Sequence, residues 1–185
     1  MMAPFFTGKG DDGTTGFLGE GRISKSSARI EALGSVDEAT AAIGFARALS
    51  QLEDTKAILL KTQQQLYWLM AELAAAPENA ERFRQLDEDH LQTLEAKIDQ
   101  LERAVTVPRE FILPGETPAA GALAIARTVV RRAERSTVRL SETGEMVRPL
   151  LVAYLNRLSS LLFILEVAES SEFGKGPKPA KVPVP

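Results

Sequence analysis

The chain has 185 residues, of which 44% are hydrophobic and 25% are charged, and its formal net charge is −3. This size and composition are typical of one globular domain with a sizeable core, and the acidic balance offers no basic footprint for nucleic acid. The chain contains no cysteine, which excludes disulfides, thiolate metal sites and cysteine nucleophiles. We find no apolar run near the roughly 20 residues of a spanning helix and no signal-peptide pattern. We therefore expect a cytoplasmic protein without a nucleic-acid or membrane partner.

Glycine is concentrated in the first 25 residues, where helical periodicity is absent. Glycine adopts backbone angles that are closed to other residues, so we predict a glycine-rich loop over 1–25 within the same domain as the helices that follow. The glycines of this segment are Gly8, Gly10, Gly13, Gly16, Gly19 and Gly21.

Five helices are predicted over residues 26–170, because apolar residues recur there at spacings of three and four. The expected ranges start at Ser26 for the first helix and then run over 54–76, 86–104, 117–140 and 145–169. Pro77 ends the second helix, and Thr117 followed by Pro118 is typical of an N-cap and first turn. No segment has the period of a strand, so we expect an all-α five-helix bundle. We expect the Pro- and Lys-rich tail, 171–185, to be disordered.

The single histidine, His90, lies in a polar stretch of the third predicted helix. A catalytic triad or a histidine-rich metal site would have to use it. A solvated surface residue is the simpler interpretation, and no metal-ligand set is predicted.

The segment 7–16, followed by Arg22 and Lys25, combines glycines with hydroxyls and cations. Glycines let backbone N–H groups turn toward an anion, and hydroxyls and cations add phosphate contacts. The segment lacks the Gly-Lys-Ser/Thr ending of a P-loop and the aspartate spacing of an EF-hand. A phosphate cradle and a flexible N-terminal loop both remain open.

Two helical segments carry polar residues that a simple bundle does not require. Arg127, Arg131 and Glu134 share one helix face, where stacked arginines repel one another unless an anion lies between them. The alternative is a solvated basic face. Asn156 and Ser160 are one turn apart in the otherwise apolar fifth helix. Buried polar groups need partners, and these residues serve either hydrogen bonds inside the bundle or ligand recognition.

These segments resemble, in order and spacing, the signature of the PduO-type ATP:cob(I)alamin adenosyltransferases, which make adenosylcobalamin. The resemblance spans about Phe6 to Ala168. It is carried by the blocks 10–16, 22–25, 31–38, 111–115, 126–135 and 155–159. It implies a ferritin-like, cobalamin adenosyltransferase-like fold that forms a homotrimer with the active site between subunits.

The resemblance also implies the substrates and the site. ATP with Mg²⁺ would lie under the N-terminal loop, with Arg131, Glu134 and Asn156 on the nucleotide. The loop residues implied in ATP binding are Thr7, Gly8, Lys9, Gly10, Asp11, Gly13, Thr14, Thr15 and Lys25. Arg127 would pair with Asp37 of the neighbouring subunit to form the site, and Phe111 would pack beneath the corrin ring. A flavoprotein reductase and a B12-dependent enzyme are the implied protein partners.

The implied chemistry needs no side-chain nucleophile, because cob(I)alamin supplies the reactivity. The chain departs from the family pattern at Gly8, Glu116 and Ser160, where the family commonly has a basic residue, a glycine and a carboxylate. A non-catalytic sensor or carrier that binds ATP or a corrinoid is therefore the alternative. A purely structural helical module is the third possibility.

Overall fold

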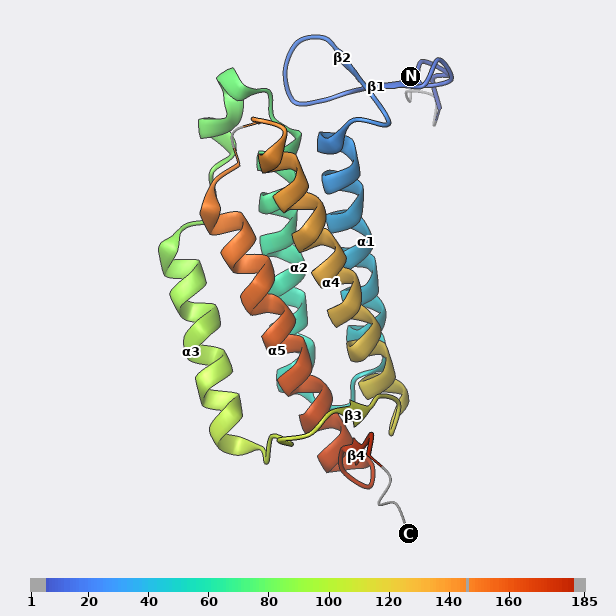
Figure 1. Cartoon of the computed structure of the whole chain (residues 1–185), viewed down its shortest axis with the longest axis vertical. Helices are drawn as coiled ribbons and strands as arrows, with labels where there is room; N and C mark the ends of the chain where they lie inside the picture. The colour runs from blue at the N-terminus through green and yellow to red at the C-terminus, as the bar shows by residue number, and fades with distance from the viewer. Residues whose placement is uncertain (1–5, 146, 182–185) are drawn as a thin grey trace.

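The computed structural model describes residues 6–145 and 147–181 and forms a helical bundle (Figure 1). The helices are α1 Ala28–Leu49, α2 Glu53–Ala74, η1 Pro77–Phe83, α3 Glu88–Ala104, α4 Pro118–Glu142 and α5 Pro149–Phe173. The predicted all-α bundle is confirmed, and the five α-helices match the five predicted segments within a few residues. The short 3₁₀-helix η1, which begins at Pro77, was not predicted.

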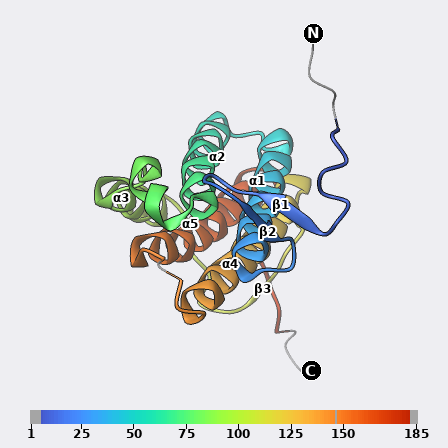
Figure 2. The same cartoon turned by 90° about the horizontal axis from the view of Figure 1, so that it is seen from above.

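The core lies among α1, α2, α4 and α5, and α3 packs on the outside of α5 (Figure 1 and Figure 2). Helix α4 has the most extensive contacts, with α1 on one side and α5 on the other. The α4 residues Ala122, Ala126 and Ala133 are almost completely buried. Small side chains at these spacings let the neighbouring helices approach closely.

Polar side chains define where the helices begin. The Ser27 side chain accepts from Ile30 N at 3.3 Å at the start of α1. The predicted N-cap Thr117 accepts from Ala120 N at 3.0 Å at the start of α4. Each bond satisfies an N–H group that the first turn leaves without an intrahelical partner.

Helix α5 is long and apolar enough to cross a membrane by length and composition alone, with a mean hydropathy of 1.6 over its most apolar window. The sequence analysis did not recognise a run of this length. In the fold, 67% of that window is buried inside the bundle, as expected for a central helix that packs against neighbours on several sides.

Two short antiparallel ladders were not predicted. β1 Thr14–Gly16 pairs with β2 Arg22–Ser24, and β3 Ile112–Leu113 pairs with β4 Lys178–Pro179. Strands of two or three residues are too short to show the alternation by which a strand is read from sequence.

The tail differs from the expected disorder in the part that the structure describes. α5 continues to Phe173, and Gly176, at φ 75°, helps to turn the chain back toward β3. The backbone N–H of Ala180 then donates to the carbonyl of Phe111 at 2.7 Å. Backbone pairing with the 111–113 segment therefore orders a sequence that composition alone indicates as a free tail. Residues 182–185 lie outside the described part.

Arg29 fastens the N-terminal end of the molecule to the bundle. Its guanidinium donates to the carbonyls of Leu73 and Ala75 at 2.7 and 2.9 Å, and its Nε donates to Glu145 at 2.8 Å. Ala75 also forms a parallel bridge with Leu18, which follows β1. Buried Arg29 thus donates hydrogen bonds to carbonyls at the end of α2. It also holds Ala75, with which Leu18 of the N-terminal segment pairs.

Candidate functional site

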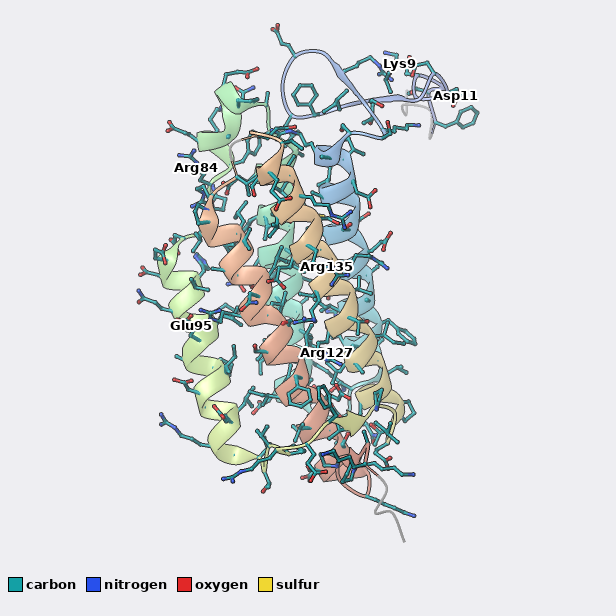
Figure 3. The ribbon with its side chains drawn as sticks, viewed as in Figure 1. Lys9, Asp11, Arg84, Glu95, Arg127 and Arg135 are labelled. Carbon is teal, nitrogen blue, oxygen red and sulfur yellow. The ribbon has the colours of Figure 1, made fainter. Side chains whose placement is uncertain are left out.

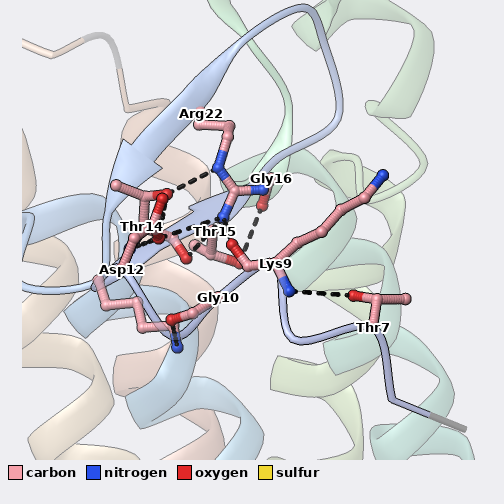
Figure 4. A network of polar contacts seen from close by, with 9 residues as sticks. Thr7, Lys9, Gly10, Asp12, Thr14, Thr15, Gly16 and Arg22 are labelled. Atoms are coloured by element: carbon pink, nitrogen blue, oxygen red, sulfur yellow. Dashed lines mark hydrogen bonds and ion pairs between the residues drawn. The ribbon is translucent and has the colours of Figure 1, made fainter.

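Arg22 on β2 organises the N-terminal loop (Figure 4). Its Nε donates to Thr14 Oγ1 at 2.6 Å, and its Nη2 donates to Thr14 O at 3.0 Å and to the carbonyl of Lys9. Asp12 accepts from the backbone N–H and the hydroxyl of Thr14 at 2.9 and 2.8 Å. These bonds lower the pKa of Asp12, because they stabilise the charged form of its carboxylate. Sequence reasoning counted Arg22 among the phosphate-binding cations and overlooked Asp12, although Asp-x-Thr is a common turn-forming pattern.

Lys25 closes the loop on the side of α1. Its Nζ donates to the carbonyl of Gly10 at 2.6 Å, and its backbone N–H donates to the carbonyl of Gly13 at 2.9 Å. A Cβ at Gly10 would lie 3.0 Å from Lys25 Nζ, so a larger residue would displace the ammonium group. Gly8 and Gly13 have φ of 69° and 80°, a region that favours glycine.

The loop therefore brings the predicted phosphate-binding residues into one hairpin. Exposed side chains such as those of Thr7, Lys9 and Asp11 remain on its surface, and Thr7 Oγ1 accepts from Lys9 N at 3.4 Å. The residues gathered here are Thr7, Gly8, Lys9, Gly10, Asp11, Gly13, Thr14, Thr15 and Lys25. Hydroxyls, ammonium groups and turn N–H groups in this arrangement suit an anionic ligand.

Arg127, Arg131 and Glu134 form a polar stripe along α4. This stripe lies beside α5. Asn156 Nδ2 donates to Glu134 Oε1 at 2.9 Å, so the two helices are joined at the point that sequence reasoning singled out. The other end of the amide, Asn156 Oδ1, accepts from Arg157 Nη1 at 2.7 Å. Arg131 is exposed one turn away on α4. The structure thus brings Arg131, Glu134 and Asn156 together on one face.

Two cavities follow the stripe toward β3. One, of about 340 Å³, is lined by Arg109, Glu110, Phe111, Ile112, Arg127 and Phe163. The other, of about 390 Å³, has Arg127, Arg131, Ser160 and Phe163 among its lining residues. Phe111 is 88% exposed, which is unusual for a large apolar side chain and suits a residue that packs against a flat apolar ligand. Arg127 and Phe163 lie on the walls of both cavities.

Arg127 has an acidic neighbour that the sequence analysis overlooked. Its Nε lies 3.9 Å from Glu166 Oε2, and its guanidinium carbon lies 5.9 Å from the centre of the Phe163 ring. Burial raises the pKa of Glu166, and the charge of Arg127 acts in the opposite direction. Glu166 is the one charged residue in the otherwise apolar run 161–167. Because a buried charge is costly, its position in this run could have indicated a nearby basic partner.

Asp37 does not pair with Arg127 within the chain. It is exposed on α1, whereas the adjacent Glu38 forms an ion pair with Arg132 of α4. Its expected pairing with Arg127 of a neighbouring subunit stays a prediction.

The loop and the stripe are separated along the bundle. Lys9 and Asp11 lie beyond one end of the helices, while Arg127 and Arg135 lie along α4 with Arg127 toward the opposite end (Figure 3). Within 6–145 and 147–181, no group of three or more histidine or acidic side chains converges to hold a metal ion. Asp11 is exposed on the N-terminal loop, and its backbone N–H donates to the carbonyl of Gly8 at 3.1 Å.

A family model described as cobalamin adenosyltransferase matches residues 5–169. The helical bundle and the order of its polar segments agree with this match. The chain belongs to the cobalamin adenosyltransferase family, as the sequence resemblance predicted.

Named relatives and solved structures support the assignment. The chain is 40% identical over 168 residues to the corrinoid adenosyltransferase PduO of Salmonella typhimurium, covering 90% of this chain and 50% of that protein. It is 38% identical over 177 residues to the corrinoid adenosyltransferase of Bacillus subtilis, covering 92% and 89%. A variant PduO-type ATP:corrinoid adenosyltransferase from Lactobacillus reuteri, complexed with cobalamin and ATP, has a TM-score of 0.88 and 32% identity, covering 97% of this chain and 100% of that chain. The chain thus spans about half the length of the PduO relative.

Proposed function

We propose that the chain transfers the 5′-deoxyadenosyl group of ATP to the cobalt of cob(I)alamin. The observation that carries the proposal is the arrangement of Glu134 and Asn156, which are hydrogen-bonded between α4 and α5, with the two adjoining cavities that Arg127 lines, one beside Arg131 and the other beside the exposed Phe111. Such a face offers polar and cationic groups to a nucleotide and an apolar surface to a corrin ring. The similar Lactobacillus reuteri structure was solved with cobalamin and ATP bound.

In the proposed reaction, the cobalt(I) electron pair attacks C5′ of the ATP ribose. The Co–C5′ bond forms as the C5′–O5′ bond breaks, and the electrons of that bond leave with triphosphate. The substrate supplies the nucleophile, so the protein has to hold C5′ in line with cobalt and to stabilise charge on the leaving group.

The proposed roles fall on the N-terminal loop, on helices α4 and α5, and on the segment that carries Phe111. Lys25 and the hydroxyls of the loop bind the triphosphate, and Asp11 would hold Mg²⁺, which would neutralise negative charge on the leaving triphosphate. Arg131 adds a cation on the α4 side, and the Glu134–Asn156 pair contacts the nucleoside. Phe111 packs beneath the corrin ring, where an apolar floor excludes a lower axial ligand and eases reduction of cobalt(II) to cobalt(I).

A complete site requires more than one chain in this proposal. The loop lies at one end of the bundle and the Arg127 end of the stripe lies toward the other (Figure 3). A loop from one subunit that covers the stripe of the next would bring them together. We propose a cytoplasmic homotrimer with the active site between subunits, with Asp37 of one subunit beside Arg127 of another. A flavoprotein reductase would supply cobalt(I), and a B12-dependent enzyme would receive the product.

A non-catalytic ATP or corrinoid sensor or carrier is the second candidate. Ser160 favours it, because this exposed serine offers no charge to the cavity that it lines beside Arg131. Glu116 favours it as well, because it adds a charge after the loop that carries Phe111.

An anaerobic assay with purified protein, chemically reduced cob(I)alamin, ATP and Mg²⁺ decides between them. Visible absorbance follows the cobalt–carbon bond, and mass spectrometry identifies adenosylcobalamin and triphosphate. Formation of both products supports the transferase. Binding of ATP or cob(I)alamin without product supports the sensor or carrier, and failure to bind either ligand contradicts both candidates.

A further inference from the structure

Glu166 is a buried carboxylate that the proposed reaction does not use. Its side chain is only 2% exposed on α5, and it is flanked by the buried apolar residues Leu165 and Val167. Its Oε2 accepts no hydrogen bond within 6–145 and 147–181. A buried charge without a partner is expensive, so the position of this carboxylate calls for a cation nearby.

Arg127 supplies that cation, and one of its own nitrogens also lacks a hydrogen-bond partner among the described residues. Its Nε is also buried and donates to no acceptor in the described part of the chain. The two atoms lie 3.9 Å apart, which is longer than a hydrogen bond but within reach of a small side-chain rotation or one bridging water. Arg127 Nε can therefore donate to Glu166 Oε2, and this one hydrogen bond would satisfy both atoms.

Part of the Arg127 side chain faces the two cavities. The side chain is 31% exposed although its Nε is buried, so the exposure comes from other atoms of the side chain. Arg127 lines both the cavity beside Phe111 and the cavity beside Arg131. It therefore stands between the proposed corrin side and the proposed nucleotide side.

We propose that Glu166 is a positioning residue that holds Arg127 Nε from the core side and presents the terminal guanidinium nitrogens to the site. This inference rests on the proposed function of Arg127. It assigns the two faces of the guanidinium to different partners: the buried face to Glu166 of the same chain, and the outer face to the ligand or to Asp37 of a neighbouring subunit.

The kinetic test compares Glu166→Gln with Glu169→Gln. Both remove a buried carboxylate from α5, but Glu169 contacts Ser50 and Leu52 at the α1–α2 turn and lies away from both cavities. We expect Glu166→Gln to lower kcat about tenfold with a KM for ATP within about twofold, because a misplaced Arg127 acts mainly in the transition state. Glu169→Gln should leave both constants unchanged.

A double-mutant cycle separates positioning from a general structural effect. If Glu166 acts through Arg127, Glu166→Gln has no further effect on kcat in an Arg127→Gln background. Equal losses in the two backgrounds, or the same loss in Glu169→Gln, would overturn the proposal. Glu166→Leu is a second charge-free variant that should fold, because the Arg127 side chain that it leaves without its partner is 31% exposed and its charge is therefore not fully buried, and it should reproduce the loss.

A spectroscopic readout keeps this inference separate from the proposed function. In protein labelled with ¹⁵N-arginine, the Nε–H signal that disappears in Arg127→Gln belongs to Arg127. We expect this signal to be protected from solvent exchange in the parent protein and in Glu169→Gln, and to exchange rapidly in Glu166→Gln. An unchanged signal in Glu166→Gln contradicts positioning. A parent protein that makes no adenosylcobalamin contradicts the proposed function, while the signal still decides the role of Glu166.

Discussion

Asn156 on α5 donates its side-chain amide to the carboxylate of Glu134 on α4 at 2.9 Å. The same amide accepts from Arg157 at 2.7 Å, and Arg157 Nε donates to Glu95 on α3 at 2.9 Å. A polar chain therefore crosses three helices and ends at the proposed nucleotide site. It fixes the direction of the Asn156 amide, because the nitrogen faces the acidic partner and the oxygen faces the basic one.

Replacement of Asn156 should disturb nucleotide use more than stability. Asn156→Asp places a second carboxylate beside Glu134, and like charges at this distance repel. We expect the KM for ATP to rise about tenfold and the free energy of unfolding to fall by about 1 kcal/mol. Steady-state kinetics and urea denaturation measure the two effects. Glu95→Ala, which breaks only the far end of the chain, should keep the KM for ATP within about twofold, and an equal rise would contradict the assignment.

Arg131→Ala should weaken ATP use without unfolding the bundle. Arg131 is exposed on α4, so its truncation removes a cation without opening the core. We expect kcat/KM for ATP to fall at least about tenfold, the scale for loss of one phosphate-binding cation, with an unchanged melting temperature. Arg139→Ala, also exposed on α4, is the matched control and should have no effect. Unchanged kinetics in Arg131→Ala would remove the phosphate role.

Phe111→Ala should harm the reaction that starts from cobalt(II) more than the reaction that starts from preformed cobalt(I). The 88% exposed ring contributes little to the core, so the loss would reflect the corrin floor. The two assays are run on the same preparation, with Tyr67→Ala on α2, where the ring is 66% exposed, as the control. Equal losses from both starting states would refute the floor.

Arg29→Ala should be strongly destabilising. The change leaves the carbonyls of Leu73 and Ala75 without their side-chain donor and removes the partner of Glu145. We expect a loss of about 3 kcal/mol in the free energy of unfolding, measured in urea. Arg84→Ala breaks only the surface pair with Glu81 at 3.3 Å and should cost less than about 0.5 kcal/mol. Similar losses in the two variants would show that the buried contacts of Arg29 contribute little.

Glu166 should make the free energy of unfolding depend on pH. Burial raises the pKa of this carboxyl above its ordinary value of 4.5, with Arg127 acting against the shift. Its contribution to stability is therefore full below pH 4.5 and is lost as the pH rises through the pKa of the folded state. Glu166→Gln should gain stability relative to the parent protein over the same rise, in urea denaturation at several pH values. A constant difference, or one of opposite sign, would contradict the shift.

The helices were predictable because their signals are local. Spacing of apolar residues indicates each helix, and Thr117 with Pro118 marks the start of α4. The pairing of β3 with β4 depends on residues 112–113 and 178–179, which are too far apart in sequence for a local pattern. The same reason explains the ordered tail.

The site was predictable as a set of segments and less so as a set of contacts. The glycine-rich loop and the polar residues of α4 and α5 were found from their residue types, whereas the hydrogen bond between Glu134 and Asn156 joins two helices and was not predicted. Glu166 was missed because its partner lies on another helix. The roles of Arg22 and Asp12 within the loop were missed because their hydrogen bonds depend on the folded hairpin. The pairing of Arg127 with Asp37 stays a prediction.

The ladder between β3 and β4 brings the exposed Ala180 to the carbonyl of Phe111, at 2.7 Å from N to O. Because the chain has no cysteine, a thiol-reactive dye would label an Ala180→Cys variant at that single position. A corrin ring absorbs visible light, so a dye held there would lose emission by energy transfer when the ring arrives at Phe111. The architecture thus provides an optical reporter of corrinoid occupancy that requires no catalysis and leaves every proposed ATP-binding residue unaltered.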